Sequence, residues 1–591
     1  MGVARWGSAA RSAAAAGLAA VLATSGCSLI SSEEPPGPPS SAQRAASSAD
    51  PEQAGQPGRP RDPDLGIGTG WGPSQAEIRR AVRLVRGMSV RELAGQVIVT
   101  DYLGTTAPVD LVDRLHLGGV ILFDANIASS RAVRSQLRTL RDEVERPWPL
   151  WISADQEGGL VERLQHDLTR FPTFMSAGAA DRAGVVRAAA RASGRELAWL
   201  GLTADFAPVA DVTGGPADPT IGSRSASEFA QRSARAVVAA SRGYADAGIV
   251  PVVKHFPGHG SAPSDSHLTL PELDRPLRGL RKIDLVPFRA AIADGAPAVM
   301  VGHLDVRAVA PGKASSLTSA IATDLLRDQL GFEGLVTSDA LDMAAVTDRA
   351  GSALSAVRAL RAGVDLLVMP PDPRAARDGI VEAVREGDLP LRRLQQAAAR
   401  QGALMLHRAA RVREDVARPA KPGAARGASW RLSRAAVTQV AGECGVRNVS
   451  DRVLLTGPDD DVAALASAFR TYGVGIYTPP PPPEPPRKDA ADDARRAGAR
   501  PSPRPSPSAS PAPLPADVTR VAVTGYRGGP VSGDVVVSSD SPWSLGSSSA
   551  PVKIAAYGDT TGAMRAVVQV LLGRRAPGTL PVRVDGVDRG C

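Results

Sequence analysis

Short apolar runs alternate with longer segments of helical periodicity between residues 75 and 411. A short continuous apolar run is typical of a buried strand, whereas apolar residues three or four apart are typical of an amphipathic helix. Strands that alternate with helices form parallel sheets, because each return to the same edge requires a crossover. Eight strands are expected, over 96–102, 119–123, 150–154, 202–206, 250–254, 298–302, 334–338 and 364–369. The pattern therefore predicts an α/β fold, with a (β/α)8 TIM-type barrel over residues 75–411.

A second α/β pattern follows over residues 435–591. Buried strands are expected at 453–456, 521–524, 535–537 and 552–556, and a helix is expected at 563–572. A proline-rich stretch at 479–515 interrupts this pattern, and its composition cannot bury enough apolar surface to offset the entropy lost on ordering. We therefore expect a smaller second domain that carries a disordered insert.

The N-terminal segment resembles an export signal. Two arginines precede a short apolar stretch at 12–24, and Cys27 follows a Ser-Gly pair, as in the lipobox of bacterial lipoproteins. Thr24 stands where that motif usually has Leu or Val, and the apolar stretch is too short to span a bilayer. We expect residues 1–26 to be a lipoprotein signal peptide, Cys27 to be lipidated, and residues 27–74 to form a flexible tether. A plainly secreted protein and an uncleaved anchor helix remain as alternatives.

The composition narrows the class of protein. A hydrophobic fraction of 43% over 591 residues rules out wholesale disorder, and three cysteines exclude a disulfide scaffold or a cysteine-based zinc module. The net charge is +8, but 63 of the 69 basic residues are arginine, which indicates a bias of the whole chain. No basic run carries interleaved aromatic residues for stacking on bases, so we expect no binding to nucleic acid.

Polar residues gather after three of the expected strands. Three of the seven histidines and one of the six lysines lie between Lys254 and His267, after the fifth strand. Asp155 follows the third strand and Asp339 follows the seventh. Because the chemistry of a barrel lies at the carboxyl ends of its strands, these groups are expected to share the mouth of the barrel. Solvated loop residues are the alternative, but they do not explain why all three clusters fall on one face.

The sequence KHFPGHG at 254–260, followed by DSH at 265–267, strongly resembles the signature of bacterial N-acetyl-β-glucosaminidases of glycoside hydrolase family 3. DQEGG at 155–159, IGSRS at 221–225 and SDALDM at 338–343 occur in the family's order. The tail from Ala556 to Val582 is similar to the family's C-terminal αβα sandwich domain. The resemblance therefore implies both the barrel and the nature of the second domain.

The resemblance also implies a role for each polar residue. It makes Asp339 the nucleophile and His267 the acid/base, with Asp265 as the partner that orients the imidazole. It assigns sugar binding to Asp155, Arg163, Arg224, Lys254 and His255. Asp339 could instead cap a helix, and His267 could be an ordinary exposed histidine. Glu157 is expected to have a structural role in its loop, and His303 is left unassigned.

The function expected from these residues is a retaining β-N-acetylhexosaminidase. It would release terminal non-reducing β-linked N-acetylglucosamine through a covalent glycosyl-aspartate. The resemblance implies this sugar, with peptidoglycan-derived fragments as the expected source and chitin fragments as an alternative that the sequence does not separate. The alternatives are a phosphorylase or a β-glucosidase of the same family, and a sugar-binding lipoprotein without catalysis. We expect no cofactor and no metal, a monomer, and an extracytoplasmic position anchored to the cell membrane. In that oxidising setting Cys444 and Cys591 could form a disulfide, with two unpaired thiols as the alternative.

Overall fold

The computed structural model describes residues 60–165, 167–347, 351–413, 418–480, 514–525, 528–529 and 531–591. The expected signal peptide, Cys27 and most of the expected tether lie outside these residues. Nearly all of the proline-rich insert lies outside them as well. No helix in the described ranges combines the length and the apolarity needed to cross a membrane.

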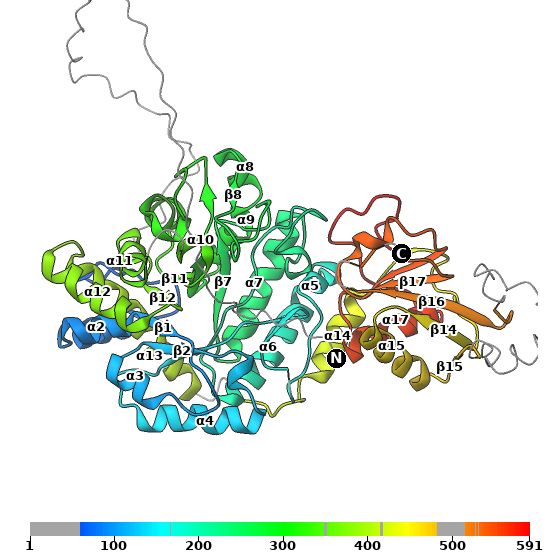
Figure 1. Ribbon diagram of the computed structural model, residues 1–591, viewed down its shortest axis with the longest axis horizontal. Helices are drawn as coiled ribbons and strands as arrows, with labels where there is room; N and C mark the ends of the chain where they lie inside the picture. The colour runs from blue at the N-terminus through cyan, green and yellow to red at the C-terminus, as the bar shows by residue number, and fades with distance from the viewer. Residues whose placement is uncertain are drawn as a thin grey trace, which may run out of the picture. The chain divides into compact units, whose positions relative to one another are not determined.

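Eight parallel strands form the first sheet, in the order β3-β2-β1-β12-β11-β9-β7-β6. Strands β1, β2, β7, β11 and β12 of this sheet are labelled in Figure 1. The bounds of the eight strands are β1 Ile98–Thr100, β2 Gly119–Ile121, β3 Trp151–Ser153, β6 Ala204–Asp205, β7 Val250–Phe256, β9 Ala298–Val301, β11 Leu335–Ala340 and β12 Leu366–Val368. Backbone hydrogen bonds close the sheet between β3 and β6, from Thr203 N to Ile152 O at 2.8 Å and from Phe206 N to Ala154 O at 3.0 Å. Each expected apolar run contains one strand, so the barrel prediction is confirmed.

The helices and short elements of the barrel connect these strands. The longer helices are α1 Gln75–Arg86, α2 Val90–Gln96, α3 Val109–Leu115, α4 Ser130–Glu143, α6 Ala183–Leu200, α7 Ala230–Asp246, α9 Leu285–Ala293, α11 Ser352–Ala362, α12 Pro373–Glu386 and α13 Leu391–Arg413. A π-type helix, η5, covers Ala320–Gln329. The short elements are β4 Gln156–Gly158, β5 Val161–Glu162, β8 Glu272–Leu273, β10 Asp305–Val306, η2 Asp124–Asn126, η3 Gly222–Arg224, η4 Ser315–Leu317, α5 Met175–Ala180, α8 Leu277–Lys282 and α10 Ala344–Thr347.

The first helix shows why these segments are helical. Ser74 and Glu77 form a reciprocal capping box that satisfies two of the free N–H groups at the start of α1. The buried residues of α1 are Ile78, Ala81, Val82 and Val85, which lie on one face at helical spacing. Apolar periodicity and capping therefore agree at this helix.

Residues 60–74, which we expected to belong to the tether, pack against the barrel instead. Leu65, Ile67 and Trp71 are buried, and the guanidinium of Arg61 forms an ion pair with Glu333. Three apolar residues scattered among Gly, Asp and Pro give no periodic signal, which is why the pattern did not reveal this segment. Residues 60–74 therefore belong to the barrel domain, and the tether cannot extend to residue 74 as expected.

A buried cluster of charges lies at the amino end of the strands. Asp365, which directly precedes β12, accepts hydrogen bonds from Arg327 at 2.5 Å, Arg393 at 2.8 Å and Arg400 at 3.3 Å. The carboxylate is fully buried, and these guanidinium groups hold its pKa below the ordinary value although burial alone would raise it. The arginines also donate to backbone carbonyls, Arg327 to Gly334 O and Arg393 to Leu360 O among them. This cluster fastens the end of the barrel opposite the mouth.

We expect Asp365→Ala to lower the free energy of unfolding by about 3–5 kcal/mol, because three buried cations would lose their shared anion. Urea unfolding followed by circular dichroism measures the loss. Glu382→Ala is the control, since Glu382 pairs with Arg385 at an exposed site and its removal should change stability by less than about 0.5 kcal/mol. A loss below about 1 kcal/mol for Asp365→Ala would contradict this view of the cluster.

A six-stranded sheet forms the second domain, in the order β13-β18-β17-β16-β14-β15. Its strands are β13 Thr438–Ala441, β14 Arg452–Thr456, β15 Gly475–Ile476, β16 Val518–Thr524, β17 Val535–Ser538 and β18 Val552–Ala555. The helices of this part are α14 Arg426–Ala436, α15 Asp459–Thr471, α17 Thr561–Leu571 and the 3-10 helix η6 Pro542–Leu545. The four expected strands and the expected helix are present. The edge strands β13 and β15 were not expected from the sequence.

Alternate residues of the second sheet belong to two different apolar cores. Val521 and Val523 of β16 share a core with residues of α15 and α17. Ala522 of the same strand and Val536 of β17 lie in the core that also contains the barrel. Successive residues of a strand point to opposite faces, so one face of the sheet carries helices and the other is buried with the first domain. The second face of this sheet is therefore covered within the apolar core that also contains the barrel.

Helix α5 allows the two domains to approach closely. All six residues of α5 are buried, and most of them are Ala, Ser or Gly. A methyl group placed on Gly178 would lie 1.8 Å from Ala226 O and 3.1 Å from Pro581 of the second domain. Small side chains at this position are therefore required by the close approach of the backbone, as happens wherever two segments meet without room for a Cβ.

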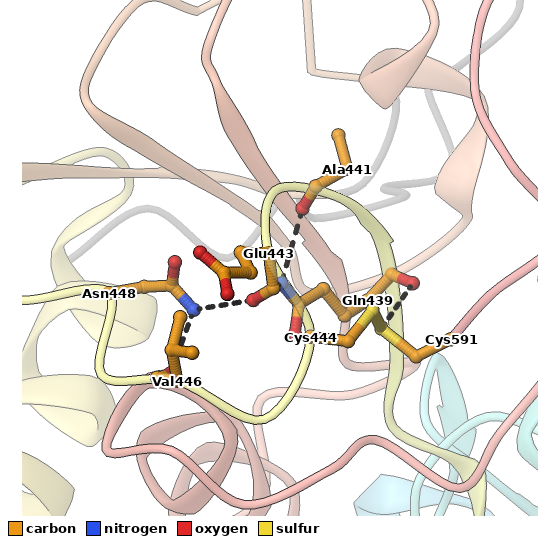
Figure 2. The surroundings of a disulfide bond; sticks show 7 residues. All are labelled: Gln439, Ala441, Glu443, Cys444, Val446, Asn448 and Cys591. Carbon is orange, nitrogen blue, oxygen red and sulfur yellow. Dashed lines mark hydrogen bonds between the residues drawn. A yellow bond between two sulfur atoms is a disulfide. The ribbon is translucent and has the colours of Figure 1, made fainter.

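A disulfide joins Cys444, in the loop after β13, to Cys591 (Figure 2). The Sγ of Cys591 lies 3.7 Å from the carbonyl oxygen of Gln439 in β13. The Gln439 amide donates to Glu443 O, and Asn448 donates to the same carbonyl, so the loop between them is tied on both sides. The bridge closes a long stretch of chain and links the edge strand of the second sheet to residue 591.

Candidate active site

A buried ammonium group stands at the centre of the barrel mouth. Lys254 lies near the carboxyl end of strand β7 and is 2% exposed. Its Nζ lies 2.6 Å from Asp155 and 2.7 Å from Glu157. Burial alone would lower the pKa of Lys254, but the two carboxylates outweigh that effect and raise it. The structure therefore brings together Lys254 and Asp155, which the sequence places in separate clusters.

Arg224 completes this charge network. Its Nε and Nη2 donate to the two carboxylate oxygens of Glu157, each at 2.9 Å. Burial would raise the pKa of Glu157, but Arg224 and Lys254 hold it well below its ordinary value. Glu157, expected to have only a structural role in its loop, is thus the anion that both cations share. The Nη1 group of Arg224 makes no hydrogen bond to Glu157.

His255, the neighbour of Lys254 in β7, is fixed from behind by a carboxylate. Its Nδ1 lies 2.7 Å from Asp211 Oδ2, and Asp211 Oδ1 accepts the backbone N–H of His259 at 2.7 Å. Asp211 is fully buried, and the imidazoles of His255 and His259 hold its pKa below the ordinary value against the effect of burial. Asp211 thereby fixes the orientation of the His255 ring and of its Nε2 edge, although Asp211 does not itself line the pocket.

Asp339 lies near the end of β11, on the same face as these groups. Its Oδ1 accepts the backbone N–H of Ala340 at 2.8 Å. Burial would raise the pKa of Asp339, but His255, His303, this hydrogen bond and Lys254 together lower it. An ionised carboxylate that faces several cationic or polarised groups is suited to act as a nucleophile at neutral pH.

His267 and Asp265 form a pair within the loop after β7. Nδ1 of His267 lies 2.7 Å from Asp265 Oδ1, and the same oxygen accepts the backbone N–H of His267 at 3.0 Å. The hydrogen bond raises the pKa of His267 and lowers that of Asp265 to about 2. The imidazole is 63% exposed, and the charges of Asp339 and Arg224 also act on it. His267 therefore belongs to the site electrostatically but makes its hydrogen bond only inside its own loop.

Arg163 stands at the rim, just after β5. Its guanidinium carbon lies 5.4 Å from the ring centre of Phe123, and its backbone N–H donates to Asp155 O at 3.4 Å. Its Nε is buried and has no hydrogen-bond partner among the described residues. An unpaired buried donor costs free energy unless a ligand or water satisfies it, so this group is available to a bound molecule.

Two residues that sequence reasoning did not assign also shape the site. His303, after β9, directs Nε2 toward Ala340 O at 2.9 Å and Nδ1 toward Ser316 Oγ at 2.7 Å, and burial lowers its pKa. His303 thus holds the backbone next to Asp339. Asp211 could have been found from one signal, since it is a lone carboxylate in an apolar stretch after the fourth strand.

The comparisons with known proteins agree with this geometry. A model of the glycosyl hydrolase family 3 N terminal domain matches residues 89–403. The protein named beta-hexosaminidase LpqI of Mycobacterium tuberculosis is 35% identical over 333 residues, which are 53% of this chain and 82% of that protein. The chain belongs to glycoside hydrolase family 3. It is a glycoside hydrolase.

Two further relatives of this family 3 enzyme extend the comparison. The beta-hexosaminidase of Alkalilimnicola ehrlichii is 39% identical over 275 residues, 44% of this chain and 75% of that protein. The solved structure of a family 3 beta-N-acetylglucosaminidase from Paenibacillus sp. str. FPU-7 superposes with a TM-score of 0.70 at 28% identity. It covers 84% of this chain and 99% of its own, so the similarity includes the second domain as well as the barrel.

The geometry of the histidine–aspartate pair leads to a pH prediction. Because Asp265 raises the pKa of His267 and burial opposes it, we expect Asp265→Ala to lower the pKa of His267 to or below its ordinary value of about 6.5. NMR titration of the imidazole measures the pKa directly. Asp265→Asn is the matched control, since it keeps an acceptor and loses the charge, and it should fall between the two. An unchanged pKa in Asp265→Ala would show that the pair is not electrostatically coupled.

Proposed function

We propose that this family 3 enzyme is a retaining β-N-acetylhexosaminidase that releases terminal non-reducing N-acetylglucosamine. The observation that carries the proposal is the ionised Asp339 at the end of β11, in the field of an imidazole that is itself paired with a carboxylate. The relatives with the names beta-hexosaminidase and beta-N-acetylglucosaminidase support the choice of sugar. The source of the substrate is proposed to be peptidoglycan-derived fragments.

The proposed reaction has two steps. In the first, an Asp339 carboxylate oxygen attacks the anomeric carbon, the bond to the leaving oxygen breaks, and protonated His267 gives its proton to that oxygen. In the second, neutral His267 takes a proton from water, whose oxygen attacks the anomeric carbon and displaces Asp339. Asp265 stabilises the imidazolium in each cycle, as the carboxylate of a triad does. The configuration at the anomeric carbon is retained because it inverts twice.

The remaining charged groups are proposed to hold the sugar. Asp155 accepts from sugar hydroxyls, while Arg163, Lys254 and Arg224 donate to hydroxyl oxygens, and His255 uses its free ring nitrogen. Charged partners give the stronger hydrogen bonds that are needed to take a neutral polyol out of water. Lys254 and Arg224 are restrained by Glu157, so little side-chain entropy is lost when the sugar binds.

The experiment that tests this proposal compares turnover of aryl N-acetylglucosaminide, aryl glucoside, a chitin disaccharide and a GlcNAc-MurNAc disaccharide side by side. We expect turnover of the aryl N-acetylglucosaminide and of GlcNAc-MurNAc, and loss of nearly all turnover in Asp339→Asn, whose amide cannot form the ester. A fluorinated sugar should leave an adduct on the peptide that contains Asp339. Turnover of the glucoside alone would reject the sugar assignment, and an adduct at Asp342 would reject the nucleophile.

A phosphorylase is the second candidate. A neutral imidazole next to the anomeric carbon repels phosphate less than a carboxylate acid/base would, and Asp265 is directed at the other side of the ring. Product analysis with and without phosphate separates the two reactions, because a phosphorylase releases the sugar 1-phosphate. Free N-acetylglucosamine as the product in both conditions supports the hydrolase.

The leaving group tests the acid/base role of His267. We expect His267→Ala to slow cleavage of a disaccharide by about 10²–10⁴-fold and cleavage of a nitrophenyl glycoside far less, because a good leaving group departs without a proton. Steady-state kinetics on both substrates measures the two losses. Equal losses would make His267 a binding residue only. Azide should restore part of the second step, since an anion needs no base.

We also propose that lipid attachment at Cys27 anchors the enzyme outside the cytoplasm. The support is the lipobox-like sequence before Cys27, which lies outside the described residues. Cys27→Ala should move the enzyme from the membrane fraction to the soluble fraction with unchanged specific activity, since the variant lacks the lipid and the expected tether keeps the barrel from contacting it. A variant that stays in the membrane fraction would indicate an uncleaved anchor helix.

A further inference from the structure

A buried hydrogen bond links the second domain to the barrel segment that carries Arg224. Ser223, in η3 of the barrel, donates from its Oγ to Asp540 Oδ1 at 2.6 Å. Asp540 comes two residues after β17, at the carboxyl end of that strand in the second domain. Ser223 is 1% exposed and Asp540 is 5% exposed, so water does not compete for this contact. A charge-assisted hydrogen bond in a dry environment is among the stronger polar contacts in a protein.

The next residue along the barrel chain is Arg224. Its guanidinium grips Glu157 with two bonds, and Glu157 in turn contacts Lys254. A short chain of contacts therefore runs from Asp540 through Ser223 and the backbone to the charges at the mouth. Within the loop, Thr220 N and Ile221 N donate to Asp218, and Ser225 Oγ donates to Asp211 O of the barrel. The contact with Asp540 ties this segment to the second domain, and a little further along the chain Ser227 Oγ donates to Pro581 O of the same domain.

We propose that Asp540 is a positioning residue for Arg224, so that the second domain sets the geometry of the sugar-binding charges of the barrel. The inference deepens the proposed function and rests on its assignment of Arg224 and Lys254 to sugar binding. Asp540 touches neither substrate nor reacting atoms. Its effect is to fix the backbone at Ser223, because a shift of the loop by a fraction of an ångström would misalign the bidentate Arg224 contact.

The first test is Asp540→Ala in the full chain, with the glycoside of the substrate panel that the wild type turns over. We expect KM to rise about tenfold while kcat stays within about threefold, because a lost charge-assisted hydrogen bond corresponds to roughly that factor. The pH profile should change little, since the hydrogen bond between His267 and Asp265, which has the largest effect on the pKa of His267, and the hydrogen bond that Asp339 accepts from Ala340 are kept. Asp540→Asn keeps an acceptor for Ser223 and should restore most of the wild-type KM.

A double-mutant cycle separates positioning from general loosening of the structure. Ser223→Ala alone should raise KM as Asp540→Ala does, and the double variant should be no worse than either single one. Ser539→Ala is the matched control, since its hydroxyl bonds to Asp461 and Thr524 O within the second domain and not to the barrel. It should leave KM unchanged.

Three results would overturn the inference. KM could stay at the wild-type value in Asp540→Ala, the effects of the Ser223 and Asp540 variants could add, or Ser539→Ala could raise KM equally. A fall in kcat alone, matched by a fall in the folded fraction by circular dichroism, would make the contact merely structural. Failure of the proposed function shows up separately, as wild-type turnover of a different glycoside from the panel, and the variants are then compared on that glycoside.

Discussion

The ammonium group of Lys254 is the constraint around which the mouth of the barrel is arranged. A cation removed from water is costly unless anions and hydrogen bonds surround it, and here two carboxylates from the loop after β3 do so. One of them, Glu157, then requires Arg224, which comes from the loop after β6. Strands β3, β6 and β7 are consequently tied together at their carboxyl ends by charge, in addition to the ladder of backbone hydrogen bonds.

This arrangement explains how the site keeps opposite charges close without neutralising them by proton transfer. Asp155, Glu157, Lys254 and Arg224 carry two negative and two positive charges, so the cluster is balanced. Asp339 and the His267–Asp265 pair make no hydrogen bond to this cluster, although the charge of Lys254 lowers the pKa of Asp339 and that of Arg224 acts on His267. The fixed charges are proposed to hold a neutral sugar, while the lowered pKa of Asp339 keeps the proposed nucleophile ionised and Asp265 raises the pKa of the proposed acid/base His267.

Much of the fold could be predicted because buried parallel strands are nearly continuous apolar runs. All eight barrel strands gave that signal, whereas β15 has two residues and β13 reads Thr-Gln-Val-Ala, which is too short and too polar to stand out. The candidate site was accessible through rare residue types in one loop, with Lys254 in an arginine-rich chain as the clearest sign. The partners of those residues were not accessible in the same way. Glu157 and Arg224 are 67 positions apart, and Asp211 precedes His255 by 44, so only the closed barrel reveals the pairing.

The close contact at α5 has a consequence for how the two parts of the chain can exist. Every residue of α5 is buried, and the face of β16 and β17 that packs with the barrel contributes Ala522 and Val536 to the same core as the barrel. A barrel cut off before α14, which packs on α5, would present the small apolar surface of α5 to water, and contiguous patches of that kind drive self-association. Each domain therefore buries an apolar surface of the other, and the two are expected to remain soluble only when they are joined.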